Sequence, residues 1–163
     1  MSGARRSVLG LWLVACSSVT SESGGWADSA TQTASDVASA DVVAVAVSGA
    51  SGAYAFDVTV RSDDLGCDQY ADWWDVRRPT GELVYRRVLN HSHVDEQPFT
   101  RSGGPVAVVA DEEVWLFAHL HPLGYTGAWM RGTVETGFQT ASEPFETSIL
   151  VWDEGPLPED CWF

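Results

Sequence analysis

The four histidines of this chain fall into two His-x-His pairs, His91 with His93 and His119 with His121. On a β-strand, residues i and i+2 point to the same face, so two imidazoles with this spacing can bind one metal ion. If the two pairs lie side by side, they offer up to four nitrogen ligands. An all-nitrogen set without thiolate favours Cu(II) or Zn(II). The alternative is that all four are surface residues hydrogen-bonded to acids and carbonyls.

The second pair ends the most regular strand pattern of the chain, residues 114–121. The even-numbered positions are aliphatic and predict a core-facing side. The odd-numbered positions carry Trp115, Phe117, His119 and His121. This strand would therefore hold two imidazoles on a rigid element with aromatic neighbours.

Loop segments occur at or next to both histidine pairs. His91 and His93 follow an expected strand and precede two acids, so the first pair is also compatible with a position in a loop. After the second pair comes a Gly/Pro-containing segment, which we expect to be a binding loop because recognition residues concentrate in loops at sandwich ends. Its residues are Pro122, Leu123, Gly124 and Tyr125.

Catalytic motifs are absent from the sequence. It has no Gly-x-Ser-x-Gly elbow, no phosphate-binding glycine loop and no His-Glu-x-x-His. Neighbouring acids such as Asp63 and Asp64 are more typical of solvated turns than of a calcium loop. Asp72 shares the predicted face of Tyr70 and Trp74, so we expect it to be buried and paired with an arginine, Arg86 or Arg87. The sequence thus favours a binding protein over an enzyme.

The elements that must position these residues are short strands. Period-two alternation and Gly/Pro turns predict seven or eight of them, and no window shows helical periodicity. They predict an all-β fold, an antiparallel β-sandwich that is immunoglobulin-like in architecture. The expected strands begin near residue 41 and include 54–60, 69–77, 83–89, 106–109, 114–121, 128–134 and 147–152.

Acidic residues dominate the charge. The chain has 23 acidic and nine basic residues, all of them arginine, for a formal net charge of −14. This balance argues against nucleic acid as a partner. It is compatible with a high-salt habitat or with cation binding, and its simplest interpretation is a well-solvated surface.

Two of the three cysteines are candidates for a disulfide, and the third belongs to a different motif. Cys67 and Cys161 form an even pair that predicts a disulfide, with free thiols or metal thiolates as the alternatives. The remaining cysteine, Cys16, follows a pair of arginines and a short apolar run that ends in Leu13-Val14-Ala15.

This N-terminal order resembles the signal peptide and lipobox of bacterial lipoproteins. The resemblance implies cleavage before Cys16, lipidation of that residue and a membrane anchor in the cell envelope. Ser17 resembles the residue that favours the outer membrane in proteobacterial lipoproteins. The expected divisions are a signal peptide (1–15), a flexible Ser/Thr/Ala-rich tether (16–40) and a β-sandwich domain (41–163).

The central block, residues 66–74 and 91–99, is similar to uncharacterised secreted proteins of bacteria. The resemblance implies no particular activity. The sequence as a whole therefore predicts a lipid-anchored extracytoplasmic module that binds an unknown protein or small ligand. The alternative is a copper- or zinc-binding lipoprotein that uses the two histidine pairs.

Overall fold

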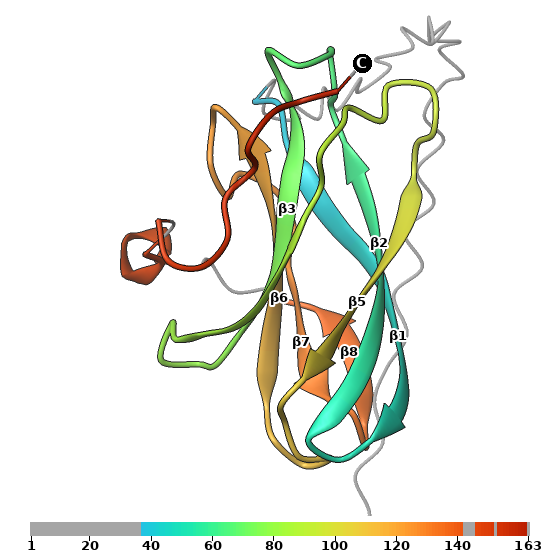
Figure 1. The fold of residues 1–163 in the computed structure, drawn as a ribbon. Coiled ribbons are helices and arrows are strands. Elements are labelled where there is room, and N and C mark those ends of the chain that lie inside the picture. Colours follow the sequence, from blue (N-terminus) through green and yellow to red (C-terminus); the bar gives the residue numbers. More distant parts are fainter. Residues whose placement is uncertain (1–36, 142–145, 152, 163) are drawn as a thin grey trace, which may run out of the picture. The chain divides into compact units, whose positions relative to one another are not determined.

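The computed structural model describes residues 37–141, 146–151 and 153–162, and within them eight strands form two antiparallel sheets (Figure 1). One sheet has the order β1-β2-β5 and the other the order β4-β3-β6-β7-β8. The predicted all-β sandwich is confirmed. The strands are β1 (Ala40–Ala50), β2 (Ala53–Ser62), β3 (Tyr70–Arg77), β4 (Leu83–Val88), β5 (Phe99–Val106), β6 (Val114–His121), β7 (Met130–Thr133) and β8 (Gly137–Thr140).

The main core lies between the sheets and follows the alternation of the sequence. In β2 the buried positions are Tyr54, Phe56, Val58 and Val60, whereas the residues between them are partly exposed. In β6 the aliphatic positions join the same core. A strand whose alternate side chains are apolar buries them most completely when a second sheet covers that face.

The opposite face of β6 carries a second, smaller apolar cluster. Phe117, Trp129 and Leu150 form its buried part. Leu150 belongs to the C-terminal segment, residues 146–151 and 153–162, which passes over the outer face of the larger sheet (Figure 1). The C-terminal segment thus gives this face a partial third layer.

Three expected elements differ from the structure. The predicted strand 147–152 is wrong for the described residues of this stretch, where Thr147–Ile149 is a 3-10 helix and Leu150 packs into the outer cluster. The expected strand 106–109 is wrong except for Val106, which ends β5 (Phe99–Val106), and the earlier part of β5, which contains two glycines, was not predicted. β8 was not predicted, because it is short and largely exposed.

A β-bulge interrupts β3 at Asp72. The β3–β6 register shifts between Ala71, opposite Leu120, and Trp73, opposite His119. A bulge adds one residue to one strand and so reverses the inward and outward positions beyond it. Trp74 therefore points into the main core, while Trp73 lies over the outer face beside His119.

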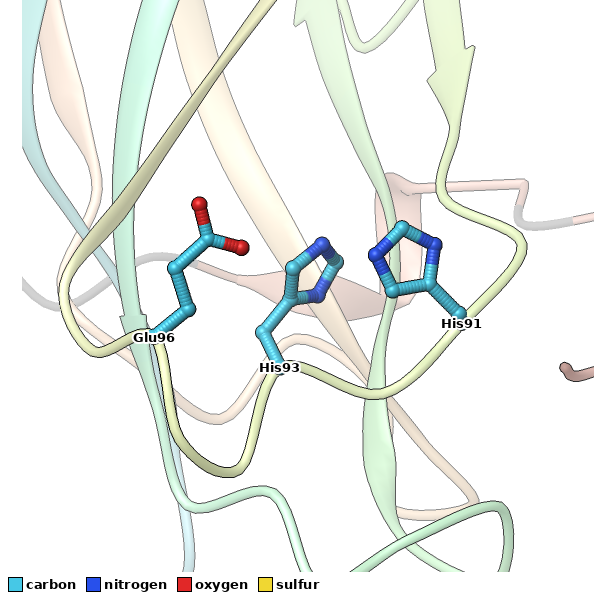
Figure 2. Close-up of side chains that lie close together, drawn as sticks. All are labelled: His91, His93 and Glu96. Atoms are coloured by element: carbon cyan, nitrogen blue, oxygen red, sulfur yellow. The ribbon is translucent and has the colours of Figure 1, made fainter. Parts of the chain in front are cut away.

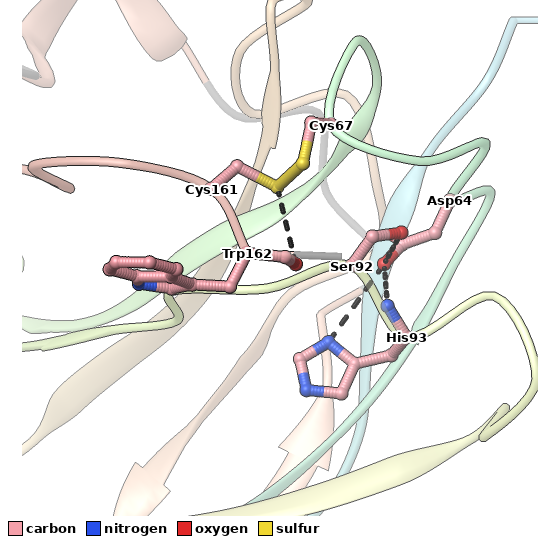
Figure 3. Close-up of a disulfide and its surroundings, with 6 residues drawn as sticks. All are labelled: Asp64, Cys67, Ser92, His93, Cys161 and Trp162. Atoms are coloured by element: carbon pink, nitrogen blue, oxygen red, sulfur yellow. Dashed lines mark hydrogen bonds and ion pairs between the residues drawn. A yellow bond between two sulfur atoms is a disulfide. The ribbon is translucent and has the colours of Figure 1, made fainter.

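The predicted disulfide is confirmed. Cys67 and Cys161 are bonded, with their Cα atoms 5.6 Å apart, and they are 94 positions apart in the sequence (Figure 3). In the chain-entropy model, a loop of this length contributes about 4–5 kcal/mol to the free energy of unfolding. The bond fastens the C-terminal segment to the loop that leads into β3.

The predicted signal peptide, Cys16 and most of the tether lie outside the described residues. Among the residues that the structure does describe, no helix is long and apolar enough to cross a membrane.

Candidate functional site

A cleft of about 790 Å³ lies on the outer face of the larger sheet, beside the disulfide. β3 and β6 supply its floor through Tyr70, Asp72, Trp73, His119 and His121. Residues 122–124 form one wall, and the C-terminal segment forms another with residues 157–161. Its volume falls within the range of small-molecule sites, about 300–1,000 Å³.

The best-defined polar group of this cleft is a pair formed by Asp72 and His119. Asp72 Oδ1 lies 2.6 Å from Nδ1 of His119, and both side chains are buried. Asp72 follows Ala71, which faces the main core, so the carboxylate of Asp72 lies on the outer face of the sheet, where it meets His119. Burial raises the pKa of Asp72, while its hydrogen bond with His119 acts in the opposite direction.

His119 is also fixed by packing. Its ring stacks on Trp73 at 3.8 Å between centroids and meets the edge of Tyr125 at 5.1 Å. With Nδ1 engaged by Asp72, Nε2 is the ring nitrogen left for a ligand. A partnered and stacked imidazole of this kind suits hydrogen bonding to a bound molecule.

The expected pairing of Asp72 with an arginine is wrong, and Asp75 has that role. Arg86 Nε lies 2.7 Å from Asp75 Oδ1, and Arg77 Nη2 lies 2.9 Å from Asp75 Oδ2. Tyr125 donates its hydroxyl to Asp75 at 2.6 Å. The bulge explains the difference, because beyond it the odd-numbered residues of β3 face outward, which places Asp75 on the outer face directly opposite Arg86 of β4.

Tyr125 is therefore part of this buried network rather than of an open loop. Burial, together with the nearby carboxylate of Asp75, raises its pKa to about 12. Its loop neighbours differ from it: Pro122, Leu123 and Gly124 line the cleft. The structure thus places three residues of the expected binding loop at the cleft and the fourth in a structural contact.

The electrostatic character of the cleft is negative. Its lining includes the carboxylates of Asp72, Glu159 and Asp160, and no arginine occurs among its described lining residues. Burial and the carboxylates of Asp72 and Asp64 raise the pKa of Tyr70, which keeps this phenol neutral. A cleft of this composition attracts positively charged groups.

The first histidine pair lies elsewhere, in the loop after β4. Donor atoms of His91, His93 and Glu96 lie within 4.8 Å of one another (Figure 2). His91 and Glu96 are exposed, whereas His93 is only 2% exposed. Burial, His91 and Arg101 lower the pKa of His93 to about 4, so the imidazole is neutral near pH 7.

The two histidine pairs do not form one group. Of the described residues, only His91, His93 and Glu96 make a set of three or more possible metal donors. The separation follows from the strand order, because β3 lies between β4, which leads into the first pair, and β6, which carries the second. Glu96 is close to the first pair in the sequence, but no pattern in the sequence predicted that its carboxylate lies beside the two imidazoles.

Fold and cleft together define a disulfide-linked β-sandwich with a ligand-sized depression on one sheet. The chain is 36% identical over 142 residues to a protein of Halomicrobium mukohataei named "Putative lipoprotein". The matched region covers 84% of this chain and 68% of that protein. The chain belongs to the family of this lipoprotein. No family model matches the chain, and no solved structure matches it.

Proposed function

We propose that this protein is a lipid-anchored, extracytoplasmic binding module and that its ligand occupies the cleft beside the disulfide. The observation that carries this proposal is the cleft itself, which combines a ligand-sized volume with the buried Asp72–His119 pair on its floor. Sites on strands hold their polar groups more rigidly than sites on loops. Membership in a lipoprotein family supports the anchor.

The composition of the cleft indicates the class of ligand. Glu159 and Asp160 add negative charge at the C-terminal wall, while Leu123 and Leu157 add apolar surface. Trp73 is only 3% exposed and carries Arg86 4.2 Å from its ring, so it does not offer an open platform for a sugar. We therefore propose a small organic cation, such as an amine with a short apolar body.

A binding assay with a matched pair of variants tests this function. Leu157→Trp fills the cleft at a residue that is 45% exposed, and Val109→Trp places the same side chain at a comparably exposed position outside it. Small amines and carboxylic acids of the same carbon skeleton are titrated into the full chain. We expect saturable binding of amines only, lost in Leu157→Trp and kept in Val109→Trp. Equal responses to amines and acids, or binding that survives Leu157→Trp, would contradict the proposal.

The anchor is tested separately. Cys16→Ala removes the proposed lipidation site, and we expect the protein to move from the membrane fraction to the soluble fraction of cells. Continued membrane association of Cys16→Ala would contradict lipidation at this residue. The outer membrane is the location implied by Ser17, and separation of the membranes of the native host tests it.

A further inference from the structure

His93 is an unusual side chain because it is buried without hydrogen-bond partners. Neither Nδ1 nor Nε2 has one, although the residue is only 2% exposed. Its closest acidic neighbour is Asp64, whose Oδ2 lies 3.9 Å from Nδ1, which is too far for a hydrogen bond. Buried polar atoms in folded proteins nearly always have partners, so two unpartnered nitrogens on one ring call for an explanation.

The position of His93 is nevertheless well fixed. Its backbone N–H donates to Asp64 at 2.7 Å, and its carbonyl accepts from Gln97 at 3.2 Å. Its ring stacks on Phe99 with 3.7 Å between centroids. Figure 3 shows this loop beside Asp64 and the disulfide, where Trp162 also donates its backbone N–H to Asn90. The chain therefore holds a neutral imidazole in place without using either of its nitrogens.

Two exposed donors lie next to this imidazole. Figure 2 shows His91 on one side of His93 and the carboxylate of Glu96 on the other. The donor atoms of the three residues lie within 4.8 Å of one another. Ligand atoms of a tetrahedral zinc ion are about 3.4 Å apart, so the donor atoms of the exposed His91 and Glu96 need to move closer by at most about 1.4 Å.

From this geometry we propose that His91, His93 and Glu96 bind a divalent transition-metal ion of the zinc type. Two imidazoles and one carboxylate suit such an ion better than Mg²⁺ or Ca²⁺, which prefer oxygen ligands alone. The site is independent of the cleft, because none of these three residues lines it.

Arg101 is the residue that could oppose metal binding. Its Nη2 lies 2.7 Å from Glu96 Oε2, and its Nη1 lies 3.3 Å from Oε1. Each carboxylate oxygen has a second lone pair, so Glu96 can contact Arg101 and a metal at once. Carboxylates that bind metals are commonly held by outer hydrogen bonds of this kind. The positive charge of Arg101 reduces the affinity but leaves a lone pair on each carboxylate oxygen of Glu96 for the metal.

Calorimetric titration with Zn²⁺ tests the site. The full chain is purified in detergent without a histidine tag, stripped with EDTA and titrated in excess Mg²⁺, which occupies sites made of carboxylates alone. The variants are His91→Ala and Glu96→Gln, both at exposed residues whose loss should not prevent folding. The controls are His121→Ala, an exposed histidine outside the group, and Glu82→Gln, another exposed glutamate paired with an arginine.

We expect one Zn²⁺ per chain and weaker binding in both loop variants. The loss of an outer-shell partner costs about 10–100-fold in metal affinity, and the loss of a direct ligand should cost at least as much. Both controls should bind like the wild type. The proposal is overturned if the wild type shows no saturable binding, if only one of the two variants is weakened, or if the controls lose as much as the variants.

Discussion

The two histidine pairs have the same spacing and different environments. In the strand pair, the buried member is His119, which has a carboxylate partner at 2.6 Å and packs against Trp73. In the loop pair, the buried member is His93, which packs just as closely against Phe99 but has no hydrogen-bond partner for its ring. Each pair also has an exposed member, His121 or His91.

The comparison shows how the same motif can serve two purposes. The protein itself supplies a hydrogen-bond partner for His119, so Nδ1 of this imidazole is satisfied before any ligand binds. The carboxylate nearest to His93 is already used, because Asp64 accepts hydrogen bonds from Ser62 Oγ and from the backbone N–H groups of Ala71 and His93. His93 is therefore the imidazole that gains most from an external partner.

The largest expected effect concerns the disulfide, which touches both regions. Cys161 lines the cleft, and its neighbour Trp162 forms a β-bridge with His91. Replacing both Cys67 and Cys161 by Ala should lower the free energy of unfolding by about 2–5 kcal/mol, as is typical for small secreted domains. Urea denaturation measures this loss, and an unchanged midpoint would mean that the C-terminal segment is held by its other contacts.

A second effect appears at high pH, on the side of the strand pair. The raised pKa of Tyr125, about 12, means that the unfolded chain loses this phenolic proton first as the pH rises above about 10. Stability should therefore fall between pH 10 and 12, by up to about 2–3 kcal/mol. Tyr125→Phe should flatten this part of the pH profile, and an equal slope in both proteins would contradict the assignment.

The difference between the regions also explains what the sequence could predict. Alternation in β2 and β6 predicted strands and core because period-two patterns report directly which face is buried. The bulge at Asp72 has no signature in the sequence pattern. Simple alternation therefore predicted Tyr70 and Trp74 on one face of the sheet, and it predicted for Asp72 the arginine that in fact pairs with Asp75.

The candidate sites were predicted only in part. The spacing of the histidines was visible, but their separation depends on strand order, which a single sequence does not contain. Glu96 joins His91 and His93 through the course of an irregular loop, where no periodicity applies. Asp64 was expected in a solvated turn, yet it is buried because it accepts hydrogen bonds from two separate segments.

A third prediction concerns the partnered histidine. His119→Leu leaves Asp72 buried without its hydrogen bond, so the free energy of unfolding should fall by about 1–3 kcal/mol. His121→Leu is the control on the same strand, and its exposed position predicts a change within about 0.5 kcal/mol. Thermal and urea unfolding compare the two. A loss no larger in His119→Leu than in the control would mean that the Asp72–His119 pair adds nothing to stability.

The smallest effect on the metal-free protein is expected at the unpartnered histidine. His93→Leu removes two buried nitrogens without partners and keeps an apolar side chain against Phe99. Replacing an unsatisfied polar group by an apolar one is close to neutral or stabilising, so the change should lie between zero and about 1 kcal/mol in favour of the variant. Zinc should reverse this order, because Zn²⁺ at a concentration of 100 times its Kd stabilises the wild type by about 2.7 kcal/mol and has no site in His93→Leu.

Urea denaturation with EDTA and with Zn²⁺ measures both halves of the comparison. If His93→Leu costs as much as His119→Leu in EDTA, the two buried imidazoles are equally satisfied and the contrast between strand and loop is lost. If it costs little and zinc stabilises only the wild type, the loop histidine is held in place for a partner that the chain itself does not provide.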